Sequence, residues 1–189
     1  ALMFEKYLPQ TDFNSYQEFI DKFEIRVPDN FNFAYDVVDE IALNDPDRTA
    51  MVWCDDKGNE ETFTFAKMKL YSDKAANFFT SIGIRKGDHV MLILKRRFEF
   101  WYCILALNKI GAVTIPATHL LTTKDIIFRN NAAGIKMIVC VPEPEVIQHV
   151  ENSLAESPGL VHKVLVCSSR EGWLNFTEGT EKASPVFNK

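Results

Sequence analysis

The sequence predicts an α/β fold in which a mostly parallel sheet carries helices on both faces, preceded by N-terminal helices and a β-hairpin. Short apolar runs bounded by turn residues are typical of buried parallel strands. Here such runs alternate with helical patterns, which predicts right-handed crossovers between neighbouring strands. The expected strands span 90–94, 112–115, 137–141 and 163–167, and the helices between them span 98–109, 123–133 and 143–154.

The unit from Lys86 to Pro116 shows this alternation most clearly. A turn leads into an apolar run, a basic triplet follows, and a segment that is apolar on nearly every side ends at Gly111. Glycine just past an apolar periodic segment is a frequent helix C-terminus. We therefore expect a strand, a helix and a strand here.

Helices and a hairpin are expected before this unit. Ser15 is placed to cap the first helix, with Glu18 in position for a capping box. Apolar spacing predicts two further helices, and two β-like runs flank a turn that contains Gly58. The helices are expected over 16–23, 33–43 and 66–82, and the hairpin strands over 50–54 and 60–65.

The length of 189 residues suits one domain or one large piece of a bigger enzyme. We expect an N-terminal arm and helix over 1–32, an α/β core over 33–167, and a polar tail over 168–189 to which the sequence assigns no structure. The longest apolar run, 100–107, is too short to span a bilayer. The first residues lack the apolar centre of a secretion signal.

The four cysteines all lie in apolar runs, and none forms a CxxC pair. This pattern predicts buried thiols in a reducing compartment, and we expect a cytoplasmic protein.

Charge is distributed unevenly along the chain, whose formal net charge is −5. Residues 1–61 carry 5 Lys or Arg against 15 Asp or Glu, residues 62–136 carry 12 against 4, and residues 137–189 carry 4 against 7. A basic middle favours a phosphate-bearing ligand. The alternative is that the charged regions face each other or water. No DNA- or RNA-binding motif is present, so nucleic acid is not an expected partner.

Motifs for phosphate loops, nucleophilic hydrolysis and metal binding are absent from the sequence. It contains no GxGxxG, no GxxxxGK, no GxSxG and no HExxH, and the four histidines lack metal-ligand spacing. The turn at 94–98 contains no glycine, which excludes a Rossmann-type or P-loop phosphate site there. We therefore expect no catalytic residue and no metal ligand in this chain.

Candidate ligand contacts follow the first predicted strand. Arg96 and Arg97 come at its C-terminal end, where ligands of open α/β sheets usually bind. Arginine is suited to bidentate phosphate contact. The alternative is an ion pair with Glu99, with Asp88 or with a neighbouring domain.

His119 follows the second strand, beside Thr118, in the same C-terminal layer. Ligand contact is one interpretation and an ordinary surface loop is the other. Trp101 and Tyr102 lie on an almost wholly apolar helix, where aromatic residues are more often part of the core than of a cofactor site.

Five segments of the chain form a pattern when they are taken in order. They are Asp45 to Ala50, Phe63-Thr64-Phe65, Gly87-Asp88-x-Val90, Arg96-x-x-Glu99-x-Trp101, and Leu107-x-x-Ile110-Gly111-Ala112-Val113-x-x-Pro116. This pattern resembles the N-terminal part of the AMP-forming acyl-CoA synthetases, members of the adenylate-forming superfamily. The similarity covers roughly 33–167 and points to the medium-chain branch, next to the acetyl-CoA synthetases.

The resemblance implies an enzyme that activates a short- or medium-chain carboxylic acid with ATP and Mg²⁺, and then transfers the acyl group to CoA. The loop Thr118-His119-Leu120 resembles a segment that borders the CoA channel. The family's ATP-phosphate loop is not in this chain, and 145–149 holds no arginine where relatives offer arginines to the CoA phosphate.

We therefore expect an N-terminal fragment that is inactive alone and binds no cofactor without the rest of its polypeptide. An apolar face of the 98–107 helix should then be left uncovered, or be buried in a homodimer. The alternative hypothesis is a free-standing α/β module that binds an anionic ligand or a protein partner.

Overall fold

The computed structural model describes residues 3–188 and confirms the α/β fold. A five-stranded sheet has the strand order β4-β3-β5-β6-β7, and every neighbouring pair is parallel. A separate antiparallel hairpin pairs β1 with β2. The sheet strands are β3 (His89–Ile93), β4 (Val113–Pro116), β5 (Ile135–Cys140), β6 (His162–Leu165) and β7 (Leu174–Asn175), and the hairpin strands are β1 (Thr49–Cys54) and β2 (Glu60–Thr64).

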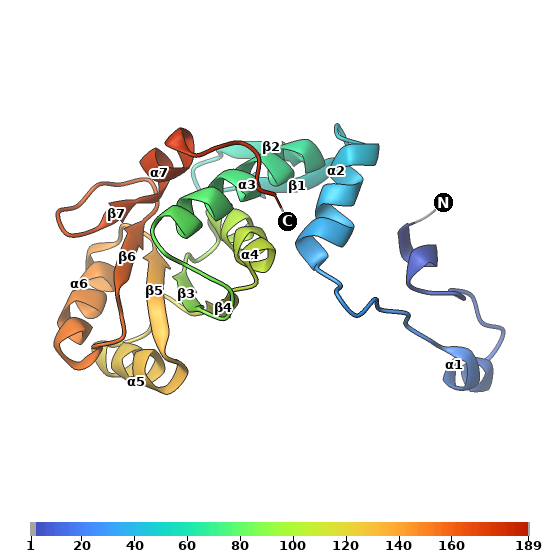
Figure 1. Cartoon of the computed structure of the whole chain (residues 1–189), viewed down its shortest axis with the longest axis horizontal. Coiled ribbons are helices and arrows are strands. Elements are labelled where there is room, and N and C mark those ends of the chain that lie inside the picture. Colours follow the sequence, from blue (N-terminus) through green and yellow to red (C-terminus); the bar gives the residue numbers. More distant parts are fainter. Residues whose placement is uncertain (1–2, 189) are drawn as a thin grey trace.

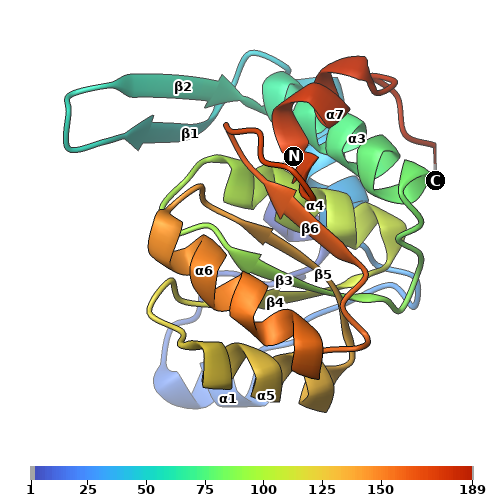
Figure 2. The ribbon, with the colours of Figure 1, turned by 90° about the vertical axis from the view of Figure 1, so that its left-hand side faces the viewer.

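Helices cover both faces of the sheet (Figure 2). On one face α3 packs against α4 and α7, and on the other face α5 packs against α6. The helices are α3 (Phe65–Ser81), α4 (Glu99–Ile110), α5 (Thr123–Ala133), α6 (Pro144–Ser153) and α7 (Phe176–Lys182). Because α4 leads from β3 to β4 on one face and α5 leads back to β5 on the other, the direction of winding reverses between β3 and β5.

The central strands form the core because their side chains are apolar on both faces. Val90, Met91 and Leu92 of β3 are fully buried, as are Met137 to Cys140 of β5. Strands covered on both sides require such continuous apolar runs. Gly111 ends α4 in the left-handed conformation, at φ 79°, which glycine adopts without a steric penalty.

The N-terminal segments lie to one side of this body (Figure 1). Ser15 caps α1 as predicted, since its Oγ accepts from the backbone N–H of Glu18 at 3.1 Å. The predicted helix over 33–43 is present, but its first part is a π-helix. The elements are the 3-10 turn η1 (Met3–Lys6), α1 (Tyr16–Lys22), the π-helix η2 (Ala34–Asp39) and α2 (Glu40–Asn44), with a further 3-10 turn, η3 (Leu154–Glu156), after α6.

The polar tail over 168–189, left without structure by the sequence, contains β7 and α7. Phe176 is buried against Phe78 and Phe79 of α3, and Trp173 is buried beside the sheet edge. Gly179 lies so close to the Phe78 ring that a Cβ would stand 2.4 Å from it. Elements of two and seven residues are too short to show periodicity, which is why the pattern missed them.

The expected uncovered face of the 98–107 helix is largely absent. Tyr102, Cys103 and Leu105 of α4 are buried, and α3 packs along the helix. Trp101, expected in the core, is instead 50% exposed. An apolar segment with no polar face cannot indicate which of its residues points away from the core.

A buried charge network ties the N-terminal helices to the body. The Nζ of Lys109, at the end of α4, lies 2.8 Å from Asp39 of η2 and 2.6 Å from Asp73 of α3. The Lys109 side chain is 0% exposed, and Lys69 makes a second contact with Asp73 at 2.6 Å. A buried ammonium requires such pairing because desolvation is costly.

Candidate functional site

A cleft of about 770 Å³ lies at the carboxyl edge of the sheet. Its walls are the segments that directly follow four neighbouring strands, together with the tip of the hairpin. This edge, beside the point where the winding reverses, is the usual ligand site of open α/β sheets. The lining segments are 53–56 at the end of β1 and in the turn after it, 95–97 after β3, 117–119 after β4, 141–143 after β5, and Cys167 after β6.

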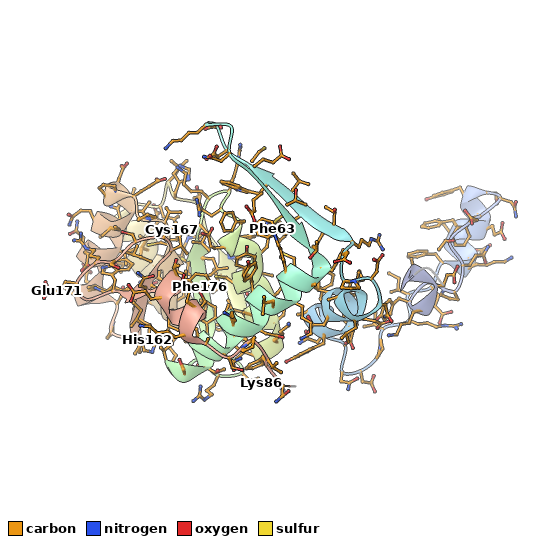
Figure 3. All side chains as sticks on the ribbon, turned by 90° about the horizontal axis from the view of Figure 1, so that it is seen from above. Phe63, Lys86, His162, Cys167, Glu171 and Phe176 are labelled. Carbon is orange, nitrogen blue, oxygen red and sulfur yellow. The ribbon has the colours of Figure 1, made fainter. Side chains whose placement is uncertain are left out.

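Figure 3 shows how the edge is oriented. Cys167, just past β6, lies on the same side of the body as Phe63 of the hairpin, whereas His162, at the start of β6, lies on the opposite side. The hairpin therefore stands over the carboxyl ends of the strands.

Aromatic residues of both hairpin strands hold the hairpin against the body: Phe63 of β2 is buried against Phe98 and Tyr102, and Trp53 of β1 faces the cleft. The indole Nε1 of Trp53 donates to the backbone carbonyl of Arg96 at 2.8 Å. Its ring packs edge-on against Phe98 at a centroid distance of 5.1 Å, and the Arg97 guanidinium lies 4.7 Å from the Phe98 ring centre. These contacts orient the backbone between β3 and α4.

The cations of the cleft differ in how they are paired. Lys95 Nζ lies 2.7 Å from a carboxylate oxygen of Glu143, across the cleft between the β3 and β5 ends. Arg97 forms a bidentate pair with Glu99 at 2.9 and 2.6 Å. Within residues 3–188, the exposed Arg96 side chain lies within ion-pair distance of no carboxylate, so its guanidinium is available to an anion.

Arg97, Glu99 and Cys167 form a compact polar cluster. The Arg97 guanidinium also donates to Cys167 Sγ at 3.1 Å, and the thiol donates to Glu99 Oε1 at 3.0 Å. Hydrogen bonding to the buried Glu99 carboxylate raises the pKa of Arg97. Burial, and then the hydrogen bond to Glu99, raise the pKa of the Cys167 thiol to about 11, so this thiol is protonated at neutral pH.

The structure brings four of the five predicted contact residues together. Arg96, Arg97, Thr118 and His119 all line the cleft, from two adjacent strand ends. Leu120 lies outside it and is 75% exposed, and its N–H donates to Thr118 Oγ1 at 3.3 Å. Of the two interpretations of Arg97, the ion pair with Glu99 is the one observed.

Sequence reasoning missed the contributions of Trp53, Glu143 and Cys167 to this cleft. Cys167 ends an apolar run and was expected to be buried, but Cys167 and Cys54 are exposed, whereas Cys103 and Cys140 are buried as expected. The sequence predicts the hairpin turn but not its place at the cleft, since only the tertiary fold brings it over the sheet. Cys167 also has a positive φ of 53°, a conformation that L side chains seldom adopt.

Residues 3–188 offer neither a preformed metal-ligand set nor a glycine loop that could cradle a phosphate. Across residues 3–188, no three His, Cys, Asp or Glu side chains gather as a ligand set for a metal. The turn after β3 contains no glycine through which the backbone could approach a phosphate. Any anion in the cleft would therefore be bound by side chains, and Arg96 and His119 are placed for it.

Comparison with known proteins gives a consistent result. Residues 38–188 match the family model described as AMP-binding enzyme. The chain is 38% identical over 178 residues to the mitochondrial acyl-coenzyme A synthetase ACSM4 of Mus musculus, covering 90% of this chain and 30% of that protein. It is 38% identical over 169 residues to the mitochondrial ACSM5 of Rattus norvegicus (86% and 29%) and 34% identical over 169 residues to the mitochondrial ACSM1 of Homo sapiens (86% and 29%).

The relatives bear on the length of the protein and on its location in the cell. The chain spans about 30% of the length of these relatives, whose N-terminal region it covers. The relatives are named mitochondrial, which contradicts the expected cytoplasmic location, and that expectation is wrong. The cysteine pattern on which it rested indicates a reducing compartment but not which one. In the described residues, no helix has the length and apolar character needed to cross a bilayer.

Proposed function

Because the chain belongs to the family of AMP-binding enzymes, we propose that it is the N-terminal part of an AMP-forming acyl-CoA synthetase acting on a short- or medium-chain carboxylic acid. The observation that carries this proposal is the family match over 38–188, together with relatives that are named acyl-coenzyme A synthetases.

The proposed reaction has two steps. The substrate carboxylate attacks the α-phosphorus of ATP, which forms an acyl-adenylate and releases pyrophosphate. The thiol of CoA then attacks the acyl carbon, and AMP leaves. Charge on a transferring phosphoryl group must be neutralised by cationic groups or metal ions. Residues 3–188 supply no metal-ligand set for that purpose, so we propose that the 189-residue chain alone is inactive.

We assign the cleft to the second step. CoA is a polyanion, and Arg96 offers it a guanidinium that lies within ion-pair distance of no carboxylate in residues 3–188. Thr118 and His119 line the adjacent strand end and supply hydrogen-bonding groups. The carboxylates of Asp55, Asp56 and Glu143 line the cleft as well, which would confine an anion to the side of Arg96.

The test uses the natural polypeptide that contains this chain. Acid-dependent exchange of pyrophosphate into ATP reports the first step, and formation of the CoA thioester reports the second. We expect both with acids of short or medium chain length and neither with the 189-residue chain. A natural polypeptide that forms no thioester with any such acid would refute the proposal.

Calorimetry separates this proposal from a free-standing anion-binding module. A fragment that needs the rest of its enzyme should bind neither CoA nor ATP measurably. Micromolar binding of either ligand to the 189-residue chain would favour the module instead.

A further inference from the structure

The N-terminal arm, residues 7–33, carries eight of the 17 large apolar residues that are exposed in the described part of the chain. No residue of α1 is buried. Tyr16 is 77% exposed and Ile20 is 54% exposed, one turn apart on the same helix. The arm's large exposed apolar residues are Tyr16, Phe19, Ile20, Phe23, Ile25, Val27, Phe31 and Phe33. Contiguous exposed apolar surface of this kind marks an interaction site.

The arm is nevertheless an organised unit. The backbone N–H of Arg26 donates to the carbonyl of Tyr7 at 2.8 Å, so the first and last parts of the arm lie side by side. The rings of Tyr7 and Phe31 meet edge to face at 5.4 Å, and Phe13 and Phe19 do the same at 5.3 Å. An arm that holds its own shape presents its apolar surface at little cost in conformational entropy on docking.

Only the base of the arm is fixed to the body. The Tyr7 hydroxyl donates to the carbonyl of Asp36 at 3.2 Å, and Asn32 Nδ2 donates to the carbonyl of Asn108 at 2.7 Å. Beyond these contacts the arm extends away from the sheet, on the far side of α2 (Figure 1). Its tip therefore reaches a region that residues 34–188 leave open.

We propose that the natural protein continues beyond residue 189, as its relatives do beyond the matched region, and that the arm packs against this continuation. The relatives are about three times as long as the region matched here, because that region makes up 30% of their length. After α7 the chain returns along α3, where Asn77 Nδ2 donates to the carbonyls of Ser184 and Val186, each at 2.9 Å. In Figure 1 this segment ends on the side of the body toward the arm.

The chemistry of the arm defines the surface that it fits. Residues 7–33 carry five Asp or Glu against two Lys or Arg. Lys22 pairs with Glu18 at 2.9 Å and Arg26 pairs with Glu24 at 3.1 Å, so the arm keeps a net negative charge around its apolar residues. The complementary surface is thus an apolar groove edged with lysine or arginine. A second copy of the chain is the competing occupant and is distinguished by the experiment below.

Hydrogen–deuterium exchange tests the proposal directly, by comparing the 189-residue chain with the natural polypeptide. Amides of residues 16–27 should exchange at least ~100-fold more slowly in the natural polypeptide, since docking adds to the free energy of local opening. Equal rates in the two proteins would overturn the proposal.

A matched pair of variants supplies a second readout. Ile20→Glu places a charge on the apolar side of α1, and Gln17→Glu places the same charge at a polar position of the same helix. Ile20→Glu should lower the midpoint of thermal unfolding of the natural polypeptide by roughly 4 °C or more, and that of the 189-residue chain by less than about 1 °C. Gln17→Glu should shift neither midpoint by more than about 1 °C.

The competing occupant gives an opposite outcome. If the 189-residue chain runs as a dimer in light scattering and Ile20→Glu makes it a monomer, a second copy occupies the arm and the proposal fails. This inference depends on the family relationship and not on the reaction, so a failed activity assay leaves it standing.

Discussion

Helix α4 carries a buried charge at each end, and the two ends are built differently. Glu99 begins the helix and Lys109 lies one residue before its last. Glu99 contacts Arg97 and Cys167, which both line the solvent-filled cleft. Lys109 contacts Asp39 and Asp73 in the interior, with its side chain 0% exposed. Each charge has the sign that the helix dipole favours at its end.

The difference shows how one helix serves two purposes. At its closed end, charges pair with one another and leave nothing for a ligand, so the network fixes the π-helix η2 to α3 and α4. At the N-terminal end of the helix, the buried Glu99 carboxylate contacts Arg97 and Cys167, and both of these residues line the cleft. Removing the Lys109 charge should lower the free energy of unfolding. Removing the Glu99 charge should mainly change the reactivity of the Cys167 thiol.

The largest expected effect follows from Lys109→Ala. Loss of the ammonium leaves two buried carboxylates with Lys69, which is partly exposed, as their remaining cation. Breaking a buried pair in this way lowers the free energy of unfolding by about 3–5 kcal/mol, and Lys69 should keep the loss near the lower end of that range. Urea denaturation of the 189-residue chain measures the change. Lys109→Met distinguishes the loss of the charge from the creation of a cavity, because methionine keeps most of the side-chain volume. A Lys109→Met protein within about 1 kcal/mol of the parent would contradict the electrostatic explanation.

Glu99→Gln should have a smaller effect on stability, about 1–2 kcal/mol, because Arg97 is partly exposed and can turn to water. Its main effect should be on Cys167. Burial raises the pKa of this thiol to about 11 and the Glu99 carboxylate adds to the shift, so removing the negative charge lowers that pKa. Alkylation of Cys167 at pH 8 should become at least ~5-fold faster.

Peptide mapping by mass spectrometry separates Cys167 from the other exposed cysteine, Cys54. Glu143→Gln is the matched control, since Glu143 lines the same cleft but pairs with Lys95. If both variants raise the alkylation rate equally, the effect arises from general opening of the cleft and not from the Cys167–Glu99 contact.

An ion pair of intermediate burial provides the pH test. Asp88 pairs with Lys136 at 2.8 Å. Burial alone would raise the pKa of Asp88, but the hydrogen bonds from Lys136 and from the backbone of Arg85 lower it overall. Its stabilising contribution is therefore fully present above the unfolded value of about 3.9 and is lost as the pH falls through the folded value.

Asp88→Asn should accordingly destabilise the chain by about 1 kcal/mol at pH 7, and by progressively less as the pH falls below the unfolded value of about 3.9. Urea titrations of the parent and the variant at several pH values measure this. A difference that stays constant with pH would mean that the aspartate acts through its shape and not its charge.

The smallest effect is expected at the surface. Lys6 and Glu40 form a 2.7 Å pair with both side chains well exposed. Lys6→Ala should leave the urea midpoint of the chain unchanged within the error of the measurement, because an exposed ion pair contributes little to stability. A larger loss would mean that burial does not explain the contrast between the ends of α4.

Most of the fold could be predicted from the sequence because the central strands are covered on both faces. Continuous apolar runs such as Val90 to Leu94 have few alternatives to a buried strand. The segment 168–188 could not be predicted because its elements are short and are anchored by single aromatic residues, Trp173 and Phe176. The exposure of Trp101 could not be predicted for a different reason. Helix α4 is apolar all round, so its sequence does not show which face points to solvent.

Some residues of the candidate site could be predicted from the sequence. Those that could not are held there by contacts between residues far apart along the chain. Arg96 and His119 follow adjacent strands, so the topology of a parallel sheet places them together. Trp53 lies 43 residues from the carbonyl that it contacts, and Cys167 lies 68 residues from Glu99. Such contacts are made by tertiary packing, which no local pattern encodes.

The cleft is proposed to present Arg96 to CoA, and the kinetics of the natural polypeptide carrying Arg96→Ala test this contact. We expect the KM for CoA to rise about 10-fold or more, while acid-dependent pyrophosphate exchange, which does not require CoA, stays unchanged. Lys124→Ala, which removes an exposed cation on α5 outside the cleft, should alter neither quantity. An unchanged KM for CoA in the Arg96→Ala enzyme, or an equal loss in both steps, would contradict the claim.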